Sequence, residues 1–219
     1  MKSVLLGFVA AAALATAANA AVDIFPFTSP AGPNGTSAPY TVGGVTITAS
    51  GFASNGGAAT TLFDKTGGGD ENGLGLVDDP SGDNEISGAN FVQIDTNLVP
   101  AGSTFGFQMG SDTGGEEWEV FGSNVADSFG ATPLLTGTND ESPHSLSGLG
   151  TFRYYDFKDV PNHSGCPTDA LCGNVLLTDF TVTTAVPEPA TWAMMLIGIG
   201  GLGATMRLSR KTAGAAALA

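Results

Sequence analysis

The segment VLLTDFTVT at Val175–Thr183 is long and rich in β-branched residues, which is typical of a β-strand. Five more segments have strand-like composition, mostly with alternating apolar and polar residues: Thr41–Thr48, Phe91–Asp95, Thr104–Met109, Glu117–Val120 and Phe152–Phe157. We expect each of them to form one strand. In Glu117–Val120, the pattern predicts Trp118 in the core and the two carboxylates toward water.

Shorter strands are predicted at Asp23–Phe27, Thr61–Phe63, Leu74–Val77 and Leu134–Thr136. Clusters of turn-forming residues separate the predicted strands, for example Gly67–Asp70, Asp79–Asp83 and Thr138–Asp140. About ten short strands without a helix-length periodic segment predict an all-β protein with a single β-sandwich, jelly-roll-like domain.

The composition agrees with one folded, exported β domain. Gly accounts for 32 of the 219 residues and hydrophobic residues for 42%, which favours a loop-rich β fold over a disordered chain. The formal net charge is −14 with only seven Lys and Arg residues, so no binding to nucleic acid is expected. Residues 21–185 hold three basic and 20 acidic residues, a formal charge of −17.

Residues 1–20 have the features of a signal peptide. Lys2 precedes the apolar run Val4–Ala15, and Ala18 and Ala20 supply the small residues that signal peptidase requires at its cleavage site. A membrane anchor is less favoured, because the run is too short to cross about 30 Å of hydrocarbon. The sequence therefore predicts export of an acidic ectodomain that spans residues 21–185.

Residues 186–219 form a separate C-terminal segment. Pro187 and Pro189 flank Glu188, and because proline lacks an amide donor and fixes φ, this stretch stays extended and open to an enzyme. Trp192 suits a membrane headgroup interface.

An apolar stretch, Thr191–Met206, follows the prolines. As a helix it would span roughly 24 Å, slightly less than the hydrocarbon core. Arg207, Arg210 and Lys211 come next, and by the positive-inside rule they place the C-terminus in the cytoplasm. The pattern predicts a transmembrane helix that crosses the inner membrane.

The segment PEPATWAMMLIGIGGLGATMRLSRK, from Pro187 to Lys211, resembles the PEP-CTERM sorting tail in its PEPxxWA variant. The resemblance implies that exosortase, a membrane protease of Gram-negative bacteria that make exopolysaccharide, removes the tail near Pro187–Pro189. It also implies delivery to the cell surface or to the extracellular matrix. The basic cluster is interrupted by Leu208 and Ser209, which is expected to weaken retention slightly. A plain tail anchor without processing is the alternative.

The two cysteines, Cys166 and Cys172, lie in the predicted loop before the last long strand. In an oxidising compartment they are expected to form a disulfide. A zinc site with His163 is the alternative, but it lacks a second pair of ligands.

Catalytic chemistry is not predicted. The segment 21–185 contains only two histidines, His144 and His163, and neither lies in a recognisable catalytic motif. Carboxylate pairs could arise by chance among 20 acidic residues, so their number alone indicates nothing.

Asp78, Asp79, Asp83 and Glu85 cluster in a turn-rich stretch of the kind that supplies oxygen ligands to Ca²⁺. An EF-hand is rejected, because Asn84 stands where Gly is needed. An irregular calcium site and a solvated acidic loop both remain open.

Three aromatic side chains, Trp118, Tyr154 and Tyr155, could form a carbohydrate-stacking face, although core packing is the more common role.

Two functions agree with these patterns. The first is a non-catalytic surface or matrix protein with a structural role in the exopolysaccharide or biofilm layer. The second is a calcium-dependent, lectin-like module that holds polysaccharide. The two functions differ in one electrostatic requirement. A domain of charge −17 repels an anionic polysaccharide unless a divalent cation bridges the two, so binding of such a polysaccharide requires the cation.

Overall fold

The protein is described from a computed structural model, which covers residues 20–28, 31–69, 71–111, 116–138, 142–160, 173–185 and 195–201. Residues Ala21–Ala185 form one compact unit, and every strand in the described part of the chain lies within it. A short helix at 195–201 lies outside this unit and is considered separately.

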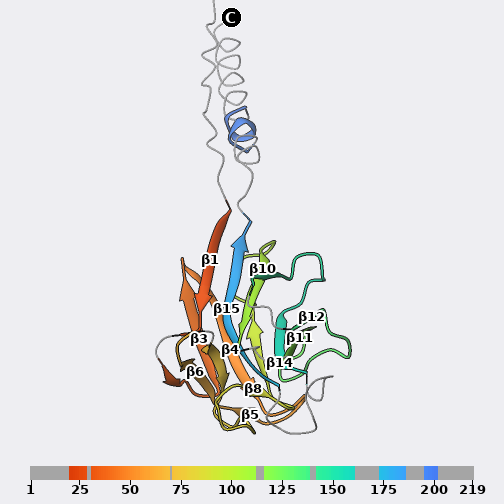
Figure 1. Cartoon of the computed structure of the whole chain (residues 1–219). Coiled ribbons are helices and arrows are strands. Elements are labelled where there is room, and N and C mark those ends of the chain that lie inside the picture. Colours follow the sequence, from red (N-terminus) through yellow and green to blue (C-terminus); the bar gives the residue numbers. More distant parts are fainter. Residues whose placement is uncertain are drawn as a thin grey trace, which may run out of the picture. The chain divides into compact units, whose positions relative to one another are not determined.

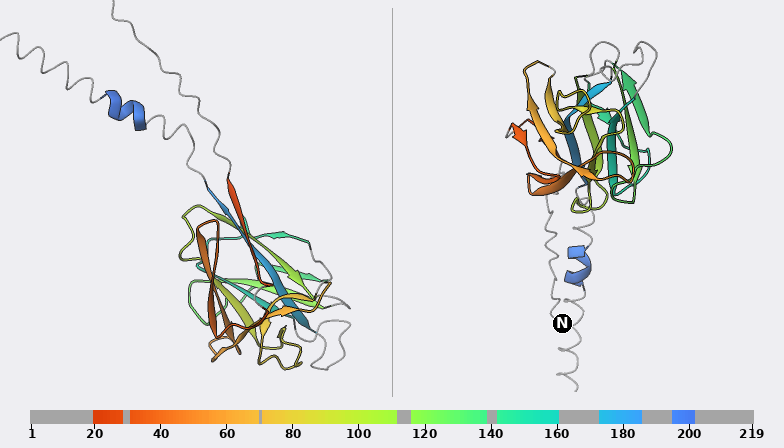
Figure 2. Two further views of the ribbon diagram at one scale, coloured as in Figure 1. Left: turned by 90° about the vertical axis from the view of Figure 1, so that its left-hand side faces the viewer. Right: turned by 90° about the horizontal axis from the view of Figure 1, so that it is seen from below.

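Two antiparallel sheets form the layers of the unit (Figures 1 and 2). Sheet A has the order β13-β10-β15-β7-β6-β2, and β1 and β8 also pair with β15. Its strands are β1 (Ala21–Pro26), β2 (Gly32–Pro33), β6 (Leu62–Thr66), β7 (Asn72–Leu76), β8 (Ile86–Ser87), β10 (Thr104–Gly110), β13 (His144–Ser145) and β15 (Asn174–Thr184).

Sheet B has the order β12-β11-β14-β9-β4-β3, and β5 also pairs with β4. Its strands are β3 (Ser37–Val42), β4 (Val45–Phe52), β5 (Ala59–Thr60), β9 (Phe91–Asp95), β11 (Glu117–Ser123), β12 (Leu135–Thr138) and β14 (Tyr154–Asp159).

The inward faces of both sheets share one hydrophobic core. Phe180 of sheet A and Ile47, Ile94 and Phe157 of sheet B are all fully buried in it. Burial of this apolar surface, at about 25 cal/mol per Å², is the main force that holds the two layers together. The predicted all-β sandwich is therefore confirmed, while its finer assignment as a jelly roll stays a prediction.

The predicted single strand at Thr41–Thr48 is wrong. This stretch contains a hairpin in which β3 and β4 pair in register from Val42 and Val45 outward. Gly43 and Gly44 form the turn, with φ of 58° and 86°. Positive φ at both central residues is the geometry of the tight hairpin turn that glycine favours.

Strand β15 pairs with two neighbours near its C-terminal end. Ala21 of β1 lies opposite Thr184, and Thr104 of β10 lies opposite Thr183 (Figure 1). We call this end of the sandwich, where Ala21, Thr104 and Thr184 lie, the exit end. The chain leaves the folded unit here and continues with residue 186.

The other end of β15 begins at Asn174, which lies opposite Ser87 of β8. The loop Val77–Glu85 leads into β8 and contains four carboxylates. We call this the acidic end of the sandwich.

Candidate functional site

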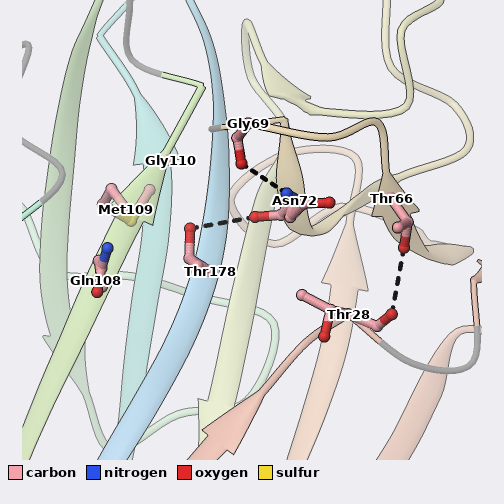
Figure 3. A pocket seen from close by; sticks show the side chains of 8 residues that line it. All are labelled: Thr28, Thr66, Gly69, Asn72, Gln108, Met109, Gly110 and Thr178. Atoms are coloured by element: carbon pink, nitrogen blue, oxygen red, sulfur yellow. Dashed lines mark hydrogen bonds between the residues drawn. The ribbon is translucent and has the colours of Figure 1, made fainter.

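A cleft of about 520 Å³ opens on sheet A, where β1 stops and the β6–β7 hairpin begins (Figure 3). Uncharged residues line it: Thr28, Thr66, Gly69, Asn72, Gln108, Met109, Gly110 and Thr178. The described part of the lining therefore offers hydroxyl and amide groups, and no charged side chain.

A β-bulge shapes this cleft. The register between β10 and β15 shifts between Gln108 and Met109, so that Thr178 is an extra residue on β15. Bulges commonly redirect a side chain. The Thr178 hydroxyl donates to the Asn72 carbonyl at 3.2 Å, which ties β15 to the start of β7 (Figure 3).

The other polar side chains of the cleft differ in how they are bonded. Asn72 donates its amide to the Gly69 carbonyl at 2.7 Å, and Thr66 donates its hydroxyl to the Thr28 carbonyl at 3.2 Å (Figure 3). Within the described residues, no hydrogen bond engages the side-chain amide of Gln108. This amide could donate to and accept from a ligand.

A group of charged side chains lies next to the cleft in sequence. Lys65 Nζ lies 2.5 Å from Glu71 Oε2 and also pairs with Glu85 Oε1. Ser111 Oγ lies 3.0 Å from one oxygen of each glutamate. Burial raises the pKa of Glu85 to about 7, although its hydrogen bond with Lys65 acts in the opposite direction. The Lys65 ammonium group thus holds two carboxylates and joins β6, the hairpin and the acidic loop. Ser111 connects the two glutamates to the end of β10.

The residues predicted to bind calcium do not converge. Asp79 is buried, and its carboxylate accepts hydrogen bonds from the hydroxyls of Ser81 and Ser87 and from the amides of Ser81, Asp83 and Glu85. These five donors occupy its acceptor sites.

The remaining carboxylates of that set have separate partners. Asp78 Oδ2 accepts from the Thr60 hydroxyl at 2.6 Å, and Glu85 pairs with Lys65. No group of three or more His, Cys, Asp or Glu side chains in the described part of the chain could hold a metal ion. The calcium site stays a prediction, and this geometry does not support it.

The aromatic side chains considered for a carbohydrate-stacking face are buried. Trp118, Tyr154 and Tyr155 are at most 7% exposed, so they do not form such a face. Trp118 lies in the core, as its flanking glutamates predicted. The His144 ring packs against Phe107 and Trp118, with ring centroids 5.2 Å and 4.7 Å apart.

Several predicted sites lie outside the described residues. They are Ala18 of the signal cleavage site, the cysteines Cys166 and Cys172, His163, the motif residues Pro187, Glu188, Pro189 and Trp192, and the basic residues Arg207, Arg210 and Lys211. The described helix at 195–201 covers only part of the predicted span 191–206. Among the described residues, no helix has the length and apolar character needed to cross a membrane.

The last strand, β15, marks the point where the chain leaves the folded unit. Strand β15 ends at Thr184, and Ala185 is the last residue of the compact unit. The family model of the PEP-CTERM protein-sorting motif matches residues 185–211. The chain carries a PEP-CTERM sorting motif. No curated protein matches the chain.

The PEP-CTERM motif indicates a secreted protein that is targeted by exosortase and sorted to the cell envelope of a Gram-negative bacterium. The match includes all the residues that the sequence predicted for sorting, from Pro187 to Lys211. This PEP-CTERM segment begins directly where the last strand of the sandwich ends.

Sequence reasoning missed the cleft and the Lys65 group. The described lining of the cleft comes from four separate parts of the chain, and no local pattern marks it. Lys65 did carry a weak signal, since it is one of only three basic residues in the segment 21–185. A rare cation in an acidic domain is a reasonable candidate for a partly buried ion pair.

Proposed function

We propose that this chain is a non-catalytic exported protein that exosortase delivers to the cell surface or to the exopolysaccharide matrix, where its sandwich domain has a structural role. The observation that carries the proposal is the match of the sorting motif at residues 185–211, immediately after β15. With this order, the whole folded unit is the cargo of the sorting tail.

The side chains of the folded unit support a role without catalysis. One carboxylate pair near the β6–β7 hairpin, Glu71 with Glu85, is held by Lys65. A pair arranged for hydrolysis would instead leave room for a substrate or a water molecule between its carboxylates. The His144 ring packs against the rings of Phe107 and Trp118.

The test is the C-terminal sequence of the mature protein, measured by mass spectrometry in the native host and in a strain without exosortase. We expect the wild-type chain to end before Thr191 and to be found at the surface or in the matrix. In the strain without exosortase, the chain should keep Arg207 and stay in the membrane fraction. A wild-type chain that still carries Arg207 would refute the proposal.

A matched pair of variants separates the motif from general effects on export. Pro189→Ala changes the motif and is expected to leave the tail uncleaved. Ala215→Ser lies beyond the matched residues and should be processed like the wild type.

One observation favours the second function, a carbohydrate-binding module. The residues that the structure describes in the cleft beside β15 are uncharged, and Gln108 and Thr178 offer the amide and hydroxyl groups that hydroxyl-rich ligands bind. Retention of the wild-type domain on the host exopolysaccharide, with calcium and then with chelator, tests this function. Retention of the wild-type domain that Gln108→Ala abolishes would support this function. If chelator also abolishes retention of the wild-type domain, binding depends on calcium, as the sequence predicted.

A further inference from the structure

The exit end of the sandwich is free of charged side chains over most of its surface. The segments that meet there are Ala21–Val22, Val42–Val45, Thr96–Thr104 and Thr183–Ala185, and none contains an acidic or basic residue. The surrounding domain has a formal charge of −17, so this uncharged surface is unusual within the molecule.

The charges that border the exit end are compensated or buried. Arg153 Nη2 lies 2.7 Å from Asp95 Oδ2, which makes a neutral pair. Asp23 is only 9% exposed. A partner that approaches this end therefore meets little electrostatic repulsion.

The exit end also offers apolar contact. Leu98 is 66% exposed and Val22 is 58% exposed. A cleft of about 310 Å³ lies beside Leu98, lined by the rest of its loop together with Phe105, Asn124 and Thr151–Arg153. The loop reaches the end of β15, because a Cβ built on Gly102 would lie 3.7 Å from Cβ of Ala185.

The covalent chain sets a limit on the distance to the motif. Only Val186 separates Ala185 from Pro187, and two residues of extended chain span at most about 7 Å. Further slack would require β15 to separate from β1 and β10, with which it pairs up to Thr184 and Thr183. A protein that encloses Pro187 in a cleft must therefore contact the exit end.

We propose that the exit end is a docking surface for exosortase, contacted through Leu98, Val22 and the 310 Å³ cleft while the enzyme holds the motif. This inference rests on the proposed function, because it requires that exosortase cleaves the chain. It assigns the folded domain a part in its own processing. The partner surface is expected to be partly apolar, to match Leu98 and Val22.

The experiment follows tail removal of the full chain in the native host by pulse labelling. Leu98→Glu places a carboxylate on the docking surface, and we expect it to slow processing by about three- to tenfold, as for one lost interface contact. Val77→Glu is the matched control, since Val77 is also exposed and apolar but lies at the acidic end. It should be processed at the wild-type rate.

A spacer tests whether the short connection is the cause. Several Gly and Ser residues inserted between Ala185 and Val186 would separate the enzyme from the exit end. With the spacer present, the chain with Leu98→Glu should be processed as fast as the chain without this substitution. Circular dichroism of the purified variants verifies that both glutamate substitutions leave the fold intact.

The outcomes are distinguishable. If the wild-type chain is never cleaved, the proposed function fails. If cleavage occurs but Leu98→Glu has no effect, the docking surface is refuted while the sorting function stands. A slowing that the spacer does not relieve, in a folded variant, also overturns the docking surface.

Discussion

The loops at the two ends of the sandwich are built on different principles. The acidic loop Val77–Glu85 contains four carboxylates, and one of them, Asp79, organises the loop from the inside by accepting five hydrogen bonds. The exit loop Thr96–Ser103 contains no charge, and two backbone hydrogen bonds turn it.

The difference shows that acidic residues in one domain can have unlike roles. A formal charge of −17 on residues 21–185 indicates a solvated surface, yet Asp79 is buried and accepts hydrogen bonds that stabilise its loop. The hydroxyls of Thr96 and Ser103 also stabilise the exit loop by donating to backbone carbonyls, whereas Leu98 is exposed and is available for contact with a partner. Four measurements test this difference between the two ends.

The largest effect is expected from Asp79→Ala. This change leaves several donors of the acidic loop without an acceptor, and we expect it to lower the free energy of unfolding by about 3 kcal/mol. Asp83→Ala in the same loop removes an exposed carboxylate and should cost less than about 0.5 kcal/mol. Urea denaturation of residues 21–185 measures both. Equal losses would show that Asp79 is not the organising residue.

The second prediction concerns the pH dependence of the acidic end. Burial raises the pKa of Asp159 to about 7, while the charge of Lys158 lowers it and that of Asp79 raises it. Because the native pKa lies above the unfolded value, the native state binds the extra proton, and stability falls as the pH rises through about 7.

We expect this group to cost roughly 2 kcal/mol of stability between about pH 5 and pH 8, because a tenfold change in proton affinity corresponds to about 1.4 kcal/mol. Asp159→Asn keeps a neutral side chain at every pH and should remove this part of the pH dependence, while Glu85, whose pKa is also raised to about 7, keeps its own part. The test compares the free energy of unfolding of the wild type and of Asp159→Asn at both pH values. A variant that loses as much stability as the wild type would exclude Asp159 as the cause.

A smaller effect is expected at the exit end from Gly43→Ala. Gly43 has φ of 58°, and a Cβ there would overlap the Asp23 carboxylate. We expect a loss of about 1.5 kcal/mol. Gly44→Ala, with φ of 86° and open space around the new methyl group, should cost only about 1 kcal/mol. Thermal melts of both variants compare steric overlap with backbone strain, and a larger loss for Gly44→Ala would contradict the geometry.

The smallest effect is expected from calcium. Because the carboxylate of Asp79 is saturated and Glu85 pairs with Lys65, millimolar calcium should change the melting temperature by less than about 1 °C. A clear rise that chelator reverses would restore the calcium site predicted from Asp78, Asp79, Asp83 and Glu85.

Local patterns predicted most strands of this fold. Val175–Thr183 falls within β15, and Trp118 is buried between outward glutamates, because both signals depend on neighbours in sequence. The turn at Gly43–Gly44 was missed because the threonines on either side continue the same alternation. The Gly-Gly pair itself was the available signal.

The remaining features depend on contacts between distant parts of the chain. Gln93 lies in a strand predicted from local alternation, but no local pattern marks that it is buried and donates its amide to Asp156, 63 residues away. Lys65 meets Glu85 and Ser111 only after folding. The sorting tail was predictable at the level of single residues, since its function lies in a linear motif rather than in a fold.

The pairing of β1 with β15 also affects the timing of export. Ala21 and Thr184 lie 163 residues apart in sequence yet opposite each other in sheet A. A chain that crosses the membrane from its N-terminus presents β1 first and must keep it unpaired until β15 emerges. Such long-range contacts slow folding and expose strand edges meanwhile. The sandwich can therefore close only when the PEP-CTERM segment is the next part of the chain to be exported, so the end of folding and the arrival of the sorting motif fall together.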